Sequence, residues 1–182
     1  MLQQIALVSQ PLLEWSLIRR VRRNHGLEHA TIHMLSRRLR GLRVAGRSSD
    51  SGFVLFGDVV TEHVEEAVNE ALRRMQNGEH NLALHPNCGT NLVTAGALTS
   101  LVALIGLSGS SLRSKFDRLP LVMMLMMFAI LVSQPLGMAL QEHFTTKGEP
   151  GDLEVVSVTR REVRMPFSSV PVTVHNVVTR GG

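Results

Sequence analysis

Residues 121–132 read LVMMLMMFAILV, twelve consecutive apolar side chains within a charge-free stretch that runs from Leu119 to Gln141. A helix needs about 20 predominantly apolar residues to cross the hydrocarbon core of a bilayer. This stretch reaches that length, and only the sequence SQP at 133–135 interrupts it. We therefore predict a transmembrane helix here.

A second charge-free stretch runs from His80 to Leu112, and its apolar part, Leu92–Leu107, is rich in alanine and glycine. Small residues allow helices to pack closely in lipid. The two apolar stretches together predict a transmembrane helical hairpin over residues 91–141, connected by Ser108–Arg118. Because the first stretch is short for a span, a buried hairpin in a soluble fold remains the alternative.

The flanking sequence predicts a small polar domain, so the expected fold class is α+β with a two-helix transmembrane hairpin. Residues 1–90 carry the motifs described below, and residues 142–182 form a β-rich tail that we expect to pack on the polar domain. The expected elements are a helix over Pro11–Leu39 broken near Asn24, strands at Leu42–Ala45 and Phe53–Phe56 around a turn at Gly46–Gly52, a helix from an N-cap at Thr61 to Met75, and strands at Leu153–Val158 and Val170–Val178.

Composition narrows the class of partner. The 182 residues carry a net charge of +4, with 17 arginines and two lysines. With no tyrosine and one tryptophan there is little aromatic surface for stacking on bases, so nucleic acid is not favoured and membrane lipids are the expected partner. The arginine-rich N-terminal region predicts a multi-pass membrane protein with a cytoplasmic polar domain, although three cations in the predicted connection oppose this orientation.

The segment HGLEHATIH, residues 25–33, satisfies the pattern H-x-x-E-H. At about 100° per residue, His25, His29 and His33 share one side of a helix, and Glu28 lies beside them. Imidazoles one turn apart can bind one metal ion, and a neighbouring carboxylate can activate metal-bound water. The alternative is a solvated polar face of an amphipathic helix.

A second segment, HPNCGTN at residues 85–91, precedes the first apolar stretch. His85 and the single cysteine, Cys88, are separated by two residues, which lets both reach one metal ion from a tight turn. We predict a zinc site whose ligands are drawn from His25, His29, His33, His85 and Cys88. In the alternative, Cys88 is a small buried hydrophobe.

The two motifs, H-G-x-E-H-x-x-I-H and H-P-x-C-G-T, resemble those of the YqhQ-like bacterial membrane proteins. The matching residues are His25, Gly26, Glu28, His29, Ile32 and His33 in the first motif, and His85, Pro86, Cys88, Gly89 and Thr90 in the second. The resemblance implies a predicted metal-dependent membrane enzyme without an assigned reaction. Those relatives look longer and carry lysine where this chain has Ala30, so we expect a separate, uncharacterised membrane family that shares the motifs.

These patterns predict a membrane-anchored metal protein and leave its chemistry open. In a metal-dependent hydrolase, Glu28 would be the catalytic general base. A non-catalytic membrane scaffold with a structural His/Cys site is the second hypothesis. A third uses Cys88 as a nucleophile with a histidine base. The sequence indicates neither a small-molecule or peptide substrate nor an oligomeric state.

Overall fold

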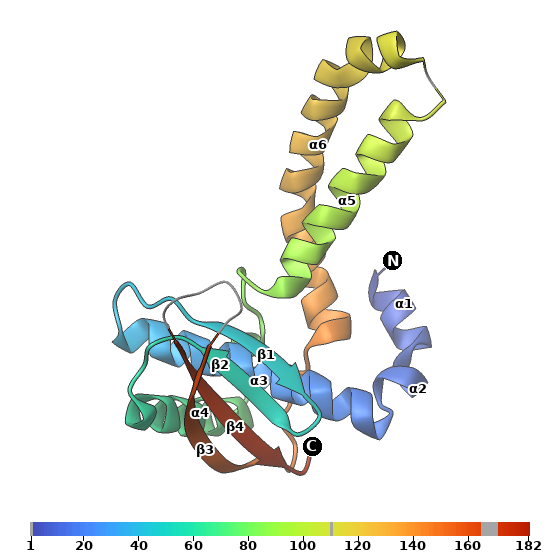
Figure 1. Cartoon of the computed structure of the whole chain (residues 1–182). Coiled ribbons are helices and arrows are strands. Elements are labelled where there is room, and N and C mark those ends of the chain that lie inside the picture. Colours follow the sequence, from blue (N-terminus) through green and yellow to red (C-terminus); the bar gives the residue numbers. More distant parts are fainter. Residues whose placement is uncertain (1, 110, 165–170) are drawn as a thin grey trace. The chain divides into compact units, whose positions relative to one another are not determined.

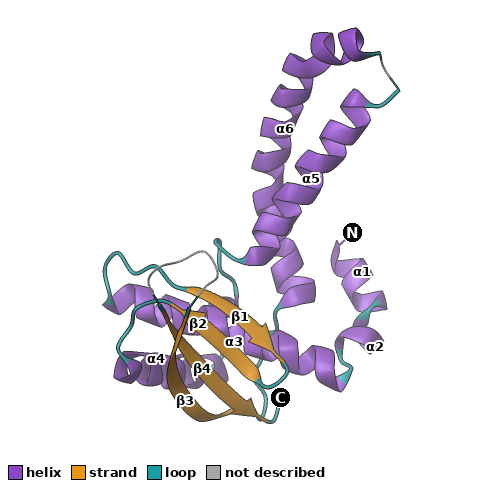
Figure 2. Cartoon of the chain, in the orientation of Figure 1, coloured by secondary structure: helices purple, strands orange, loops and turns teal. Residues whose placement is uncertain are grey.

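The computed structural model describes residues 2–109, 111–164 and 171–182. Its elements are α1 (Leu2–Val8), α2 (Gln10–Leu13), α3 (Ser16–Arg38), β1 (Ala45–Ser49), β2 (Gly52–Phe56), α4 (Thr61–Gln76), the 3-10 helix η1 (His80–Ala83), α5 (Gly89–Leu107), α6 (Leu112–Leu140), the π-helical turn η2 (Gln141–Thr145), β3 (Glu154–Val163) and β4 (Val172–Arg180) (Figure 1). Helices and an antiparallel sheet together confirm the α+β class (Figure 2).

The chain divides into two compact units. The first, which we call the polar domain, comprises residues 1–85 and 142–182, and the second comprises residues 86–141. In the polar domain the four strands form one antiparallel sheet in the order β1-β2-β4-β3. The last strand of the chain therefore lies between strands from two distant parts of the sequence.

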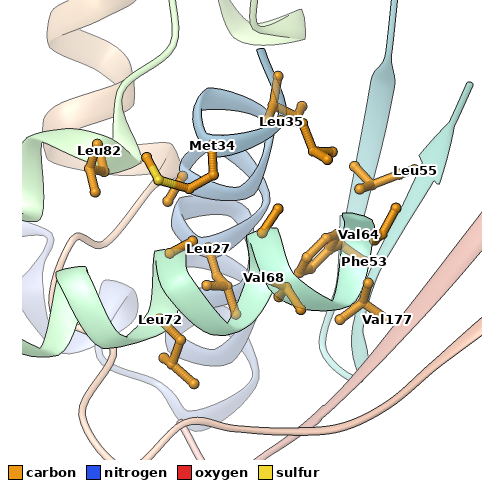
Figure 3. Packing of buried hydrophobic residues seen from close by; sticks show 14 of the residues in the cluster. Leu27, Met34, Leu35, Phe53, Leu55, Val64, Val68, Leu72, Leu82 and Val177 are labelled. Carbon is orange, nitrogen blue, oxygen red and sulfur yellow. The ribbon is translucent and has the colours of Figure 1, made fainter. Parts of the chain in front are cut away.

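The core of the polar domain lies where α3 and α4 pack against the sheet (Figure 3). Leu27 and Leu35 come from α3, and Phe53 and Val177 come from neighbouring strands; all are buried. The apolar stripe that the sequence predicts on α4 is also buried throughout, at Val64, Val68, Ala71 and Met75. Burial of these side chains holds α3, which carries three of the predicted ligands, rigidly on the sheet.

Helix α3 is continuous through Asn24, so the predicted break at that residue is wrong. The interruption lies earlier, at Glu14 and Trp15, between α2 and α3. Asn24 is buried, where its side chain donates to the carbonyl of Ser49 at 2.9 Å and accepts from Thr179 Oγ1 at 2.8 Å. Tertiary hydrogen bonds thus satisfy an amide that would otherwise disfavour a helix interior.

The first strand begins later than predicted. Ala45–Ser49 pairs with Gly52–Phe56, so the turn consists of Asp50 and Ser51 alone. β1 is an edge strand, and an edge accommodates small polar side chains that face water. The residues predicted as turn therefore form most of the strand.

Three other boundaries also differ from the predictions. β3 continues to Val163 along the other edge of the sheet, and β4 begins at Val172; Val170, where a strand was predicted to start, lies outside the described residues. α4 already begins at Thr61, so Val60, not Thr61, is its N-cap. The Thr61 hydroxyl is hydrogen-bonded to Nε2 of His175 at 3.3 Å.

The second unit is an antiparallel pair of helices, α5 and α6. The structure has two helical segments long and apolar enough to cross a membrane, Gly89–Leu107 and Arg113–Thr145, with mean hydropathies of 1.7 and 2.0. Because α6 already begins at Leu112, the connection is shorter than predicted. Arg113, Lys115 and Arg118, which were predicted to lie in the connection, lie in the first turns of α6 instead.

Candidate metal centre

Four histidines of the polar domain lie in a row. His25, His29 and His33 follow one another at successive turns of α3, and His85 lies two residues after the end of η1. The ring centroids of His25 and His29 are 4.4 Å apart, those of His33 and His85 4.8 Å, and those of His29 and His85 5.7 Å. The fold thus brings together imidazoles that are up to 60 positions apart in the sequence.

Backbone carbonyls orient the three rings on α3. Nδ1 of His25 lies 2.9 Å from the carbonyl oxygen of Thr145, and Nδ1 of His29 lies 2.7 Å from that of Ala83. A carbonyl can only accept, so each Nδ1 carries a proton, and in the neutral ring the lone pair that a metal ion requires lies on Nε2. Metal-binding histidines are commonly oriented in this way by a hydrogen bond from the second ring nitrogen.

His33 has the opposite orientation. Its Nε2 lies 2.8 Å from the carbonyl oxygen of Leu84, so the ring donates from Nε2 and keeps its lone pair on Nδ1. His29 and His33 are therefore both anchored to the same short segment, Ala83–Leu84, but through different ring nitrogens.

Gly26 explains how the backbone carbonyls come close enough. A Cβ at this position would lie 2.6 Å from the carbonyl oxygen of Lys147 and 3.1 Å from Cβ of Ala83. Arg22 stabilises the segment that leads to Lys147, because its guanidinium donates to the carbonyls of His143 and Thr146 at 3.1 and 3.2 Å. Glycine at 26 is thus required for the close approach that orients His25 and His29.

Glu28 is 4% exposed and faces β1. Its carboxylate accepts a hydrogen bond from Ser48 Oγ, and a Cβ on Gly46 would collide with it. Burial raises the pKa of Glu28, while the hydrogen bond from Ser48 and the nearby His25 act in the opposite direction. The carboxyl group consequently holds a proton more tightly than a solvated glutamate does.

His85 is affected differently. Burial, reinforced by the nearby His33 and His29, lowers the pKa of His85 to about 4. The ring is therefore neutral at physiological pH, which is the form that binds metal ions.

Cys88 directly precedes α5, in the second unit, as its N-cap residue. Its buried Sγ accepts from the backbone N–H of Thr90 at 3.4 Å. The thiol is three residues beyond His85 in the chain, and His25, His29 and Cys88 make up a group whose ligand atoms could hold a metal ion.

Sequence reasoning missed the groups that orient the site. Ser48 was assigned to a turn, and the acceptors at Ala83, Leu84 and Thr145 are backbone atoms that carry no residue-type signal. The one visible clue was Gly26, which lies inside the histidine motif although glycine disfavours a helix interior. A glycine in such a place indicates close approach of another segment.

Comparison with known proteins assigns a family. Residues 20–158 match a family described as a domain of unknown function, DUF6391. This chain belongs to the DUF6391 family. The matched range contains both histidine motifs and both apolar helices. The match does not bear on the resemblance to YqhQ-like proteins, which stays a prediction.

One relative of this DUF6391 chain is an uncharacterised protein from Picosynechococcus sp. (strain ATCC 27264 / PCC 7002 / PR-6), with 37% identity over 92 residues. The alignment covers 46% of this chain and 45% of the relative. The chain thus spans less than half the length of that protein. No solved structure matches the chain.

Proposed function

We propose that this chain is an integral membrane protein whose polar domain binds zinc, and that the bound metal supports a hydrolytic reaction. The observation that carries the proposal is the orientation of His25 and His29. Both rings donate from Nδ1 to a backbone carbonyl, so both lone pairs lie on Nε2, one helical turn apart. His29 is buried and His25 is partly buried, and two histidines with matched tautomers are the usual core of a catalytic zinc site.

The remaining ligands come from the segment around residue 85. His85 is neutral at physiological pH and belongs to the same row of rings, and Cys88 follows it by three positions. Imidazole and thiolate are both ligands that zinc favours. His33 is the alternative ligand, through its Nδ1.

Glu28 is the proposed general base. A carboxyl group with a raised pKa can accept a proton from metal-bound water and keep it through the reaction. This role requires one coordination position for water, as in catalytic zinc sites with three protein ligands.

Membrane insertion of the second unit is part of the same proposal. Within the apolar windows of the two candidate spans, only 11% and 17% of residues are buried. A core helix of a soluble protein would be mostly buried, whereas a helix pair in lipid keeps its apolar side chains outward. The arginines of α3 favour a cytoplasmic polar domain.

Metal analysis of the purified protein tests the site. After detergent extraction without chelators, we expect about one equivalent of zinc per chain. The double variant His25→Ala, His29→Ala should lose it, while the matched control His63→Ala, on α4, should retain it. Wild-type protein that binds less than about a tenth of an equivalent of zinc, even after incubation with zinc salts, would overturn the proposal.

A structural metal site is the second candidate, and the position of Glu28 favours it. The carboxylate already accepts from Ser48 and packs against the edge strand at Gly46. In that case four protein ligands would close the site and exclude water.

Cobalt(II) substitution distinguishes the two candidates. In an open site the visible spectrum should change as bound water ionises, at a pH of about 7 to 9. Glu28→Gln should keep the metal while changing this titration. A spectrum that does not respond to pH in either protein would reject the hydrolase and leave the structural site.

A further inference from the structure

Residues 2–21 expose an unusual amount of apolar surface. We call it the N-terminal apolar face; it comprises Ile5, Leu7, Val8, Leu12, Trp15, Leu17 and Val21. Val8 is 83% exposed and Trp15 is 60% exposed. Scattered apolar residues on a surface need no explanation, but seven within two short helices and the start of a third indicate a binding surface.

Helices α1 and α2 bury few side chains against the rest of the polar domain. No residue of α1 is buried, and Leu13 is the single buried residue of α2. Residues 1–13 contain no charged side chain. Such a segment gains little by folding onto the domain in water, so the stability of its helices has to come from another contact.

Positive charge borders this face. Arg22 and Arg23 have carboxylate partners, Glu14 at 3.6 Å and Asp152 at 3.5 Å. Arg20 forms no ion pair within the part of the chain that the structure describes. Arg20 follows Leu17 by three positions on α3, so these two residues are neighbours on the surface of the helix.

This combination matches one kind of partner. Tryptophan prefers the boundary between headgroups and acyl chains, exposed aliphatic side chains enter the acyl region, and arginine pairs with lipid phosphates. A cation without an ion-pair partner next to exposed apolar residues suits an anionic lipid surface, which offers phosphates and acyl chains side by side.

We propose that the N-terminal apolar face lies in the interfacial region of a bilayer, with Arg20 bound to anionic headgroups. The chain would then contact lipid at two independent places, this face and the α5–α6 hairpin. The proposal shares the membrane location of the proposed function but is independent of the metal.

Trp15 is the chain's single tryptophan, so its fluorescence reports on this face alone. The full chain would be reconstituted in nanodiscs of phosphatidylcholine and phosphatidylglycerol, with or without lipids brominated close to the headgroup. We expect a blue-shifted emission and strong quenching by the brominated lipid. We also expect Trp15 to be poorly accessible to acrylamide.

Two variants provide controls. Trp15→Phe combined with His63→Trp moves the reporter to α4, where the brominated lipid should not quench it. Arg20→Gln should weaken Trp15 quenching in the anionic discs, while Arg37→Gln, an exposed arginine at the other end of α3, should not. Circular dichroism would verify that each variant is folded.

Each other outcome has a defined meaning. Trp15 that acrylamide reaches freely and brominated lipid does not quench overturns the proposal. Trp15 that is shielded from acrylamide but not quenched by lipid overturns it too, and assigns the face to a protein surface such as a second copy. Resistance of the chain to carbonate extraction, measured on the same preparation, shows separately whether the hairpin is inserted.

Discussion

Phe53 in the polar domain and Phe128 in the α5–α6 hairpin carry the same ring in opposite surroundings. Phe53 is 1% exposed at the centre of the sheet, and Phe128 is 64% exposed on α6. The contrast extends beyond these two residues. The polar domain encloses leucine, valine and methionine, whereas the hairpin turns the same residue types outward.

The polar residues show the reverse arrangement. The two buried residues of α5 are Asn91 and Thr94, and within the same unit the Asn91 side chain accepts a hydrogen bond from Gln141 Nε2 at 2.8 Å. Water cannot stabilise an apolar exterior with a polar interior, but lipid can. The difference between the two units therefore supports the proposed insertion of the second unit into a bilayer, while the polar domain has the arrangement expected in water.

The largest effect is expected from truncating the matched phenylalanines. Phe53→Ala removes a fully enclosed ring and should lower the free energy of unfolding of the polar domain by about 3–5 kcal/mol. Phe128→Ala should change it by no more than about 0.5 kcal/mol. Urea unfolding in detergent, followed by circular dichroism, measures both. Equal losses would break the comparison between the units.

A charged residue placed on each exterior sharpens the comparison. Leu131 on α6 and Val60 before α4 are both exposed. Leu131→Arg should disfavour membrane insertion by about 2.5–3.5 kcal/mol, because the guanidinium would enter hydrocarbon. Val60→Arg faces water and should be neutral. The carbonate-resistant fraction of each variant is the measurement, and a hairpin that tolerates both substitutions would lie in water.

Two buried asparagines, one in each unit, provide a comparison with a smaller expected loss of stability. Asn24→Ala breaks the bonds with Ser49 and Thr179 inside the polar domain and should cost about 1–3 kcal/mol in urea unfolding. Asn91→Ala breaks the bond accepted from Gln141 and the bond donated to the carbonyl of Pro86, and each should cost about 0.6 kcal/mol, because an unfolded helix in lipid finds other partners. Titration with sodium dodecyl sulfate reports the second value. A larger cost at Asn91 would mean that water reaches the hairpin.

The smallest expected effect concerns pH. Burial, with the charge of Arg160, lowers the pKa of His175, so this histidine is buried in its neutral form. Its contribution to stability is complete above its ordinary pKa of about 6.5 and is lost as pH falls toward the lower folded value. His175→Gln should therefore shrink the fall in Tm between about pH 7.5 and about pH 5.5 by a few degrees. An unchanged fall would assign this pH dependence to other groups.

Local patterns predicted much of this molecule because they depend on nearby residues. The spacing of Val64, Val68 and Met75 indicates the buried stripe of α4 without any knowledge of the sheet. The charge-free stretches likewise define two helices of membrane-spanning length. In the same way, helical periodicity places His25 and His29 on one side of α3.

What the sequence could not predict depends on long-range contacts. The helix continues through Asn24 because strands more than twenty residues away accept and donate its hydrogen bonds. β1 forms from a polar segment because Phe53 and its neighbours on β2 supply a partner strand. Ser48 and the carbonyls at Ala83 and Thr145 also join the candidate site through contacts between residues far apart in the sequence.

The close approach of Gly46 to Glu28 has a consequence for the family. A side chain at position 46 would occupy the space of the carboxylate, so these two positions have to change together during divergence. A homologue with alanine or a larger residue at 46 is expected to have a shorter or uncharged residue at 28. This pairing makes it possible to recognise, from an alignment alone, which members have kept the buried acid.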